Sequence, residues 1–240
     1  MSITLKRKPI VYNYSLSGSN LNRVAVHKDL GIFIDSKLTF VDHTNHLIKK
    51  GNRMAGLVWR NFRLCRNEQV FRSIYCTLIR PNLEYCTVIF NSISKTQSDR
   101  LERVQGRYLF FMFRSLRNTE HLAHLPVNPT YTQLCEVFRL PTLQHRRTVN
   151  DCLYLYKHFH NRFSLTDVNP FSLSVPNRRT KSASKHILHV PWSRVEASKR
   201  GFISRITTAY NRLHGECDVF GAPTLKCFRQ QVNKAMSCNQ

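Results

Sequence analysis

Acidic residues are scarce in this chain. It contains 14 Asp and Glu against 37 Lys and Arg, which gives a formal net charge of +23 over 240 residues. An excess of positive charge this large attracts polyanions and speeds their association, with a steep dependence on salt. Nucleic acid is therefore the expected partner, as RNA, DNA or an RNA-DNA hybrid. Charge alone leaves open a basic surface kept for solubility, or a ribosomal or mitochondrial setting.

Long apolar runs are also missing. No segment reaches the roughly 18 to 20 apolar residues of a membrane-spanning helix, and the residues after Met1 lack a secretory apolar core. We therefore expect an intracellular protein, nuclear or cytoplasmic, with no membrane partner. Hydrophobic residues still make up 42% of the chain, so it can build a core in one large domain or two small ones.

Motifs for metals, cofactors and nucleophiles are absent from the sequence. The eight cysteines include no Cys-x-x-Cys pair, which predicts reduced thiols rather than a zinc ribbon. There is no Gly-rich phosphate loop and no Gly-x-Ser-x-Gly elbow, so neither a cofactor nor a small-molecule substrate is expected. Three histidine pairs with a spacing of three lack Cys or carboxylate partners, and we predict no metal site at them. They are His43 with His46, His121 with His124, and His186 with His189.

Carboxylates are too dispersed to predict polymerase or ribonuclease H chemistry. Two-metal phosphoryl transfer needs carboxylates that converge on the ions. The seven Asp and seven Glu include no adjacent pair. We therefore expect a chain that is not an enzyme.

Apolar periodicity indicates a small β element followed by helices. Apolar residues alternate from Ile10 to Leu16 and again at Ile32 and Ile34, with a turn predicted at residues 17–20. From about Thr44 the period becomes helical. Helices are predicted at about 68–90, with a break at Pro81, and at about 96–116, 131–140, 141–159, 199–213 and 224–236. The helix at 96–116 is predicted to be capped by Ser94 and Gln97.

The predicted fold class is mainly α with a small N-terminal antiparallel β element (α+β). We expect four segments along the chain. They are a β element at 1–40, a helical bundle at 41–160, a basic loop or linker at 161–199, and C-terminal helices at 200–240.

Basic residues recur on one side of two predicted helices. At 100° per residue, the first set falls within about 80° and the second within about 60°. Either row alone is compatible with an ordinary solvated face, but two rows with few acidic neighbours favour phosphate contact. Arg146 and Arg147 are a further candidate pair, with a helix-surface pair as the alternative. The rows are Lys49, Arg53, Arg60 and Arg63, and Arg100, Arg103 and Arg107, which Arg114 extends.

Several segments, in order, resemble one known family. The run Asp29–Phe40, with His43 behind it, is similar to the end of the palm in reverse transcriptases of non-LTR retrotransposons, most closely the jockey-like group. Three later blocks and scattered tail positions resemble the same family. They are Tyr75, Leu78, Ile79, Arg80, Pro81, Leu83, Glu84 and Tyr85; Leu101, Glu102, Val104 and Gln105; Leu140, Leu143, Arg146, Arg147 and Asp151; and Val175, Pro176, Arg179, Arg205, Tyr210 and Asn211.

The resemblance implies a palm edge, a thumb-like helical bundle and a C-terminal extension. Leu30 and Gly31 would correspond to the primer grip, and the helices after Phe40 to a thumb that holds a template-primer duplex. On a purely structural interpretation, Leu30 is a packed strand residue and Gly31 a bulge glycine. The sequence contains no Asp-Asp pair, so the resemblance implies an RNA-directed DNA polymerase fragment whose catalytic palm lay upstream.

Other interpretations remain open at this point. Tyr108, Phe110 and Phe111 could stack on bases, although aromatic residues at helical spacing are typical of a core. The chain could instead be a basic helical module that docks on an acidic protein, a polymerase seen in truncated form, or a retroelement remnant without function. Competition by duplex DNA distinguishes the first of these.

Overall fold

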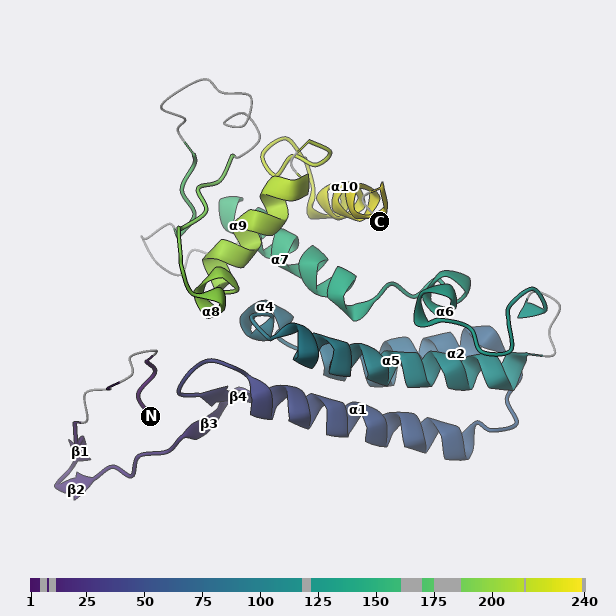
Figure 1. Cartoon of the computed structure of the whole chain (residues 1–240), viewed down its shortest axis with the longest axis horizontal. Helices are drawn as coiled ribbons and strands as arrows, with labels where there is room; N and C mark the ends of the chain where they lie inside the picture. Colours follow the sequence, from purple (N-terminus) through teal and green to yellow (C-terminus); the bar gives the residue numbers. More distant parts are fainter. Residues whose placement is uncertain are drawn as a thin grey trace. The chain divides into compact units, whose positions relative to one another are not determined.

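The structure is a computed structural model of the whole chain, shown in Figure 1. It describes residues 1–4, 8, 12–117, 122–160, 170–174, 187–213 and 215–238. The described chain forms two compact units. Unit 1 comprises residues 1–86 and 93–134, and unit 2 comprises residues 87–92 and 135–240.

The fold class expected from the sequence is confirmed: the described residues are mainly helical, with two small antiparallel sheets near the N-terminus. In the first, β1 (Ser15–Leu16) pairs with β2 (Ser19–Asn20) around a two-residue turn, so the predicted turn is two residues shorter than 17–20. In the second, β3 (Val26–Asp29) pairs with β4 (Ile32–Asp35). The predicted strand residue Ile10 lies outside the described residues.

The carboxylate of Asp35 joins the second hairpin to the first long helix, α1 (Val41–Asn61). It accepts hydrogen bonds from the backbone N–H groups of Lys37, Thr39 and Phe40 at 2.7 to 3.1 Å, and from the Thr39 hydroxyl. Burial raises the pKa of Asp35, but these hydrogen bonds outweigh it, so the net pKa lies below the usual value. The loop between strand and helix is thus held by a charged acceptor.

Proline interrupts the helical segment that follows. In place of one helix at 68–90, the chain forms α2 (Glu68–Ile74), a π-helical turn η1 (Tyr75–Ile79) and α3 (Arg80–Glu84). Pro81 stands in the first turn of α3, as predicted, because it lacks the N–H that would bond to Thr77 and its ring crowds that carbonyl. The chain then enters unit 2 as α4 (Thr87–Phe90).

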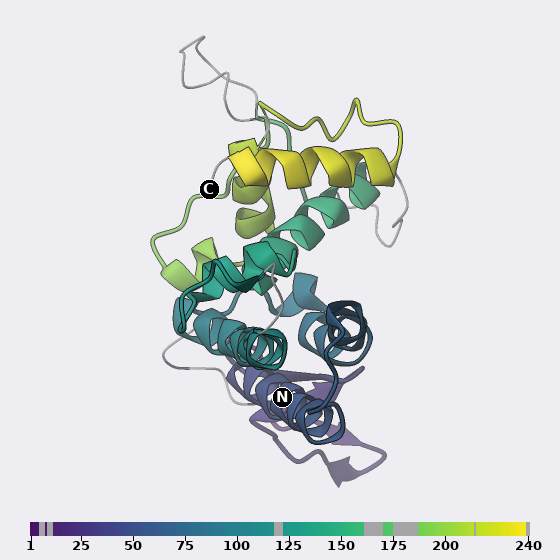
Figure 2. The ribbon, with the colours of Figure 1, turned by 90° about the vertical axis from the view of Figure 1, so that its right-hand side faces the viewer.

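Helix α5 (Lys95–Leu116) completes the core of unit 1. The predicted capping box is present, since Ser94 and Gln97 exchange side-chain and backbone hydrogen bonds. Figures 1 and 2 both show α1 and α5 lying side by side. Between them and the α2–α3 segment the chain buries Leu47, Val58, Phe71, Tyr75, Ile79, Leu83, Leu101, Val104 and Tyr108.

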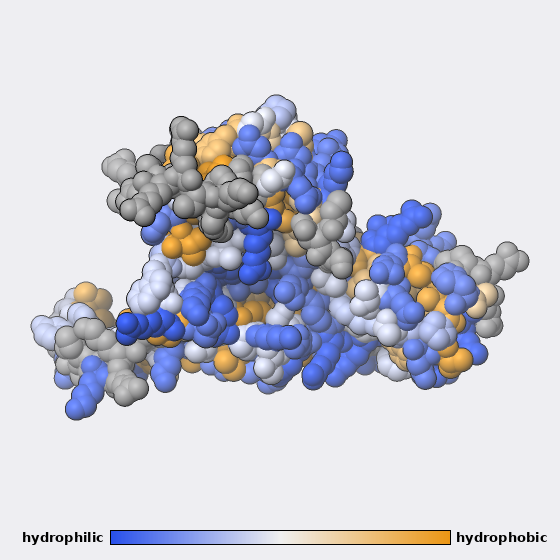
Figure 3. All heavy atoms as spheres, turned by 45° about the horizontal axis from the view of Figure 1, so that its top comes forward, coloured by the Kyte–Doolittle hydropathy of each residue, from blue (hydrophilic) through white to orange (hydrophobic). Residues whose placement is uncertain are grey.

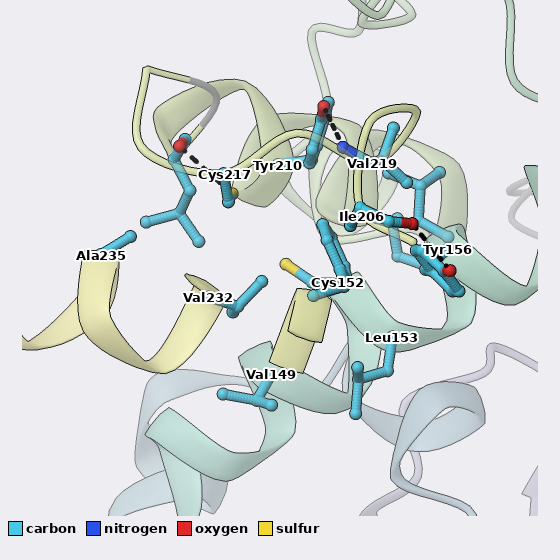
Figure 4. Packing of buried hydrophobic residues seen from close by; sticks show 14 of the residues in the cluster. Val149, Cys152, Leu153, Tyr156, Ile206, Tyr210, Cys217, Val219, Val232 and Ala235 are labelled. Atoms are coloured by element: carbon cyan, nitrogen blue, oxygen red, sulfur yellow. Dashed lines mark hydrogen bonds between the residues drawn. The ribbon is translucent and has the colours of Figure 1, made fainter. Parts of the chain in front are cut away.

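Unit 2 is built on α7 (Leu143–Phe159), α9 (Phe202–Leu213) and α10 (Leu225–Cys238). Figure 4 shows their apolar side chains meeting, with Cys152 of α7, Ile206 of α9 and Val232 of α10 fully buried. Two tyrosines tie loops to this core: Tyr210 accepts from the N–H of Val219 and Tyr156 donates to the carbonyl of Ala222. The predicted helices at 141–159, 199–213 and 224–236 agree with these three.

A buried polar network crosses unit 2. Asp151 on α7 accepts two hydrogen bonds from Arg205 on α9, at 2.8 and 3.2 Å, and one from Asn91 at 2.7 Å. Asn91 in turn accepts from Arg147 at 3.1 Å, and Arg205 donates to the Val88 carbonyl. Burial is the largest influence on the Asp151 carboxyl and raises its pKa, against the opposing effect of Arg205.

Two short helices complete the described elements. Helix α6 (Tyr131–Val137) falls within the segment predicted at 131–140, and α8 (Glu196–Lys199) falls inside the predicted linker. Residues 161–169 and 175–186 of that linker lie outside the described residues; an antiparallel bridge joins Leu173 to Leu188. The four segments expected from the sequence do not coincide with the two units, because the segment expected at 41–160 is divided between them and its last helix, α7, packs on α9 and α10 within unit 2.

Candidate nucleic-acid interface

The two predicted basic rows are exposed and lie in unit 1. On α1, the buried residues His43, Leu47, Gly51 and Val58 define the packing side of the helix. Lys49, Arg53 and Arg60 project from the opposite side and are exposed; we call these three the α1 row. Arg63 is also exposed but lies just beyond the end of the helix at Asn61.

The second row has the same arrangement. Leu101, Val104, Tyr108 and Met112 are buried on the packing side of α5. The residues that we call the α5 row are exposed on the other side: Arg100, Arg103 and Arg107. Arg114 continues the α5 row and is also exposed, with its guanidinium 5.8 Å from the centre of the Phe110 ring.

Contacts between α1 and α5 set the two rows side by side. Near the helix starts, Gln97 donates to the Thr44 hydroxyl at 3.2 Å. Further along, Arg107 donates to the Asn52 side chain at 3.3 Å. Near the ends, the rings of Trp59 and Phe111 stack with centroids 5.6 Å apart. In these three contacts, residues later in α1 meet residues later in α5. The two helices are therefore parallel, and the rows run in the same direction.

The length and the charge of the surface formed by the two rows follow from this geometry. At a rise of about 1.5 Å per residue, the α1 row spans about 16 Å, or about five base pairs of B-form duplex. Within the part of the chain that the structure describes, none of the seven predicted phosphate-binding residues of unit 1 is paired with a carboxylate. The charge of these rows is therefore available to a polyanion.

The predicted pair Arg146 and Arg147 is separated by the fold. Both lie on α7, where consecutive residues are turned by about 100°. Arg146 is half-buried, whereas Arg147 is 2% exposed and bonds to Asn91. Arg147 as a phosphate contact is therefore a wrong prediction, because its guanidinium belongs to the interior of unit 2.

Leu30 and Gly31 form the turn between β3 and β4, not a packed strand and a bulge. Their φ angles are 46° and 86°, and Leu30 is 81% exposed. Positive φ at both central positions is the type I′ pattern, in which a leucine is strained. The Tyr85 hydroxyl donates to the Leu30 carbonyl at 3.0 Å. Two segments of the family resemblance, 55 residues apart, thus meet at this turn.

The aromatic candidates are divided between core and surface. Tyr108 is buried and donates to the Phe71 carbonyl at 2.8 Å, so it is a core residue. Phe110 and Phe111 are half-buried. Sequence reasoning missed Trp59, which is 59% exposed at the seam between the two rows. The signal was its position on α1, between the apolar and basic sides of the helical wheel.

No group of three or more His, Cys, Asp or Glu among the described residues could hold a metal ion. His43 is fully buried at the start of α1, with its Nδ1 within 3.5 Å of the Phe33 N–H. His121 and His186 lie outside the described residues. Among the helices of the described ranges, none has the length and apolar character to cross a membrane. Hydrophilic residues cover much of the face drawn in Figure 3, with separate hydrophobic patches among them.

Comparison with known proteins adds no relative: no protein-family model, curated protein or solved structure matches this chain.

Proposed function

We propose that this chain binds RNA, DNA or their hybrid without sequence preference, through phosphate contacts from the α1 row, the α5 row and Arg63. The observation that carries the proposal is the parallel, side-by-side placement of two exposed rows, which no carboxylate of the described residues pairs with. Phosphate contacts of this kind are independent of base identity, because the phosphate groups are alike at every position.

The proposal includes an origin. The segments that resemble non-LTR reverse transcriptases follow one another in the same order as in that family, which supports descent from the C-terminal region of such an enzyme. On this proposal the chain retains the thumb-like bundle and has no polymerase activity. A primer-extension assay tests the second part, and polymerisation would contradict it. An in-frame Asp-Asp pair in the upstream nucleotide sequence would instead identify the chain as a piece of a full polymerase.

The binding test is the dependence of affinity on salt. If all seven residues contact phosphate, the logarithm of the association constant falls with the logarithm of salt concentration with a slope of about −6 on duplex DNA. Replacing Lys49, Arg53 and Arg60 together with Gln should weaken binding and reduce the steepness of that slope by about 3, since each lost contact removes about 0.9.

A matched control uses α10 of unit 2. Lys226, Arg229 and Lys234 are exposed, and replacing them with Gln removes the same amount of charge. This control should leave the slope almost unchanged. Equal effects of the two triple variants would place the binding elsewhere, and affinity that ignores salt in the unmodified protein would contradict the proposal.

A further inference from the structure

We infer that Trp59 is a stacking platform for an unpaired base, so that the surface formed by the two rows prefers single-stranded nucleic acid to blunt duplex. The inference rests on the proposed function and specifies its substrate class. Only the aromatic ring, not the charged rows, distinguishes a free base from a paired one, because a base inside a duplex has both faces covered by its neighbours.

The ring of Trp59 is exposed and also held in place. One side of it stacks on Phe111, with an angle of 28° between the planes, while 59% of the residue remains exposed. Phe111 is supported in turn by an edge contact with Phe71, at 5.4 Å, and by a longer one with Tyr108. Since Phe71 and Tyr108 are buried, this series of rings connects the core of unit 1 to its surface. A base would meet a ring that is already ordered.

The helix surface next to this ring is uncrowded. Long side chains on a helix lean toward the preceding turn, where α1 has Gly56, three residues before Trp59. A Cβ at Gly56 would have no atom within 4 Å, so this stretch of α1 is open. Asn52 lies one further turn back and accepts from Arg107.

Positive charge surrounds the site. Arg107 stands one helical turn before Phe111 on α5, and Arg60 and Arg63 follow Trp59. A strand whose base stacks on Trp59 would keep its phosphates within reach of these guanidinium groups. Exposed aromatic residues in a positively charged groove are the combination used to bind single strands without sequence preference.

The sequence provides a spectroscopic test, since it has two tryptophans, Trp59 and Trp192. In the full chain carrying Trp192→Phe, a 20-nucleotide oligo-dT should quench the remaining fluorescence at low salt, whereas a blunt 20-base-pair duplex should quench it far less. Oligo-dT that binds with a steep salt dependence but does not quench Trp59 would overturn the inference while leaving the proposed function intact.

Affinity gives an independent readout. Trp59→Leu should weaken oligo-dT binding at least about fivefold, since each stacked base contributes substantially, and should leave duplex binding unchanged. Trp59→Phe should retain most of the affinity for oligo-dT, because phenylalanine keeps an aromatic face. Trp192→Leu is the matched control: Trp192 is 78% exposed and also has an arginine, Arg194, over its ring at 5.4 Å, but it belongs to unit 2.

The outcomes separate the two proposals. Equal losses for oligo-dT and duplex in Trp59→Leu would show that the ring acts on folding or general binding, and would overturn the stacking role. A loss in Trp192→Leu equal to that in Trp59→Leu would overturn the assignment to this site. Failure of both oligonucleotides to bind the unmodified protein at low salt would contradict the proposed function itself.

Discussion

At the scale of single residues, His43 places an ionisable ring in the core of unit 1. It is fully buried, and its Nδ1 lies within 3.5 Å of the Phe33 N–H. Burial, reinforced by the nearby charge of His46, lowers its pKa to about 4. The fold therefore favours the neutral ring. Because an unfolded histidine titrates near pH 6.5, the stability contributed by the neutral ring is complete above that pH and is lost as the pH falls toward 4.

We predict that His43→Asn, which keeps an acceptor near the Phe33 N–H but cannot titrate, loses this pH dependence. The unmodified protein should lose up to about 3 kcal/mol of unfolding free energy between pH 6.5 and 4, beyond what the variant loses. Urea unfolding at a series of pH values measures both. The control is His27→Asn, at an exposed position on β3. Parallel pH profiles for His43→Asn and the unmodified protein would refute the assignment.

Residue identity alone did not reveal which side chains are buried. Arg146 and Arg147 are chemically identical neighbours, yet only Arg147 is buried in the interior, where Asn91 accepts its hydrogen bond and the carboxyl of Asp151 lies close enough to interact with its charge. The position of Leu30 was also not predicted from its identity. An apolar residue before a glycine suggested a packed strand, but the pairing of Asp29 with Ile32 places Leu30 in the turn of a hairpin. The burial of Arg147 depends on a partner 56 residues away in sequence, and the Leu30 turn depends on the register of the β3–β4 hairpin.

At the scale of elements, α1 contains two glycines with opposite surroundings. A Cβ at Gly51 would lie 3.0 Å from both Leu83 and Val104, in the contact between α1 and its neighbours. A Cβ at Gly56 would have nothing within 4 Å. Glycine costs a helix interior about 1 kcal/mol relative to alanine wherever alanine fits.

We therefore predict opposite effects of one substitution at two positions. Gly56→Ala should raise the unfolding free energy by about 0.5 to 1 kcal/mol, since it restricts the unfolded chain without a clash. Gly51→Ala should lower it by about 1 to 3 kcal/mol, because the added methyl forces the packed side chains apart. Denaturant melts of the two single variants are the measurement, and effects of the same sign would contradict the packing of α1.

Helices with strong local signals were predictable and the breaks between them were less so. The capping box at Ser94 and Gln97 and the apolar stripe of α5 are local features, and the observed helix matches the prediction within a residue. Pro81 indicated an interruption, but the π-helical turn before it and the separate helix α4 depend on tertiary packing. The exposed rows were likewise predictable from the helical period, whereas their parallel alignment required the contacts of α5 with α1.

At the scale of the whole molecule, the candidate interface and the buried ion pair belong to different units. The interface lies in unit 1, and the ion pair of Arg205 with Asp151 lies in unit 2. The Asp151 side chain is 1% exposed and that of Arg205 13% exposed. Removing one member of such a pair leaves the other charged and buried, which typically costs about 3 to 5 kcal/mol.

We predict that Arg205→Leu destabilises unit 2 by about 3 to 5 kcal/mol while nucleic-acid affinity under native conditions stays within twofold of that of the unmodified protein. Hydrogen exchange of α7 and α9 reports the first effect, and an oligonucleotide titration the second. Arg212→Leu, an exposed change on the same helix, is the control and should have little effect on exchange. The double variant Asp151→Leu with Arg205→Leu should recover part of the loss, and no recovery would argue against the pairing.

The path of the backbone has a practical consequence. Residues 87–92 leave unit 1, contribute Thr87, Val88 and Asn91 to unit 2, and return. Cutting the gene at residue 135 would therefore yield a C-terminal product without three hydrogen-bonding partners of α7 and α9. The N-terminal product would carry six residues that belong to unit 2. To purify unit 1 alone, residues 87–92 should be replaced with a short linker in addition to removing the C-terminal part of the chain.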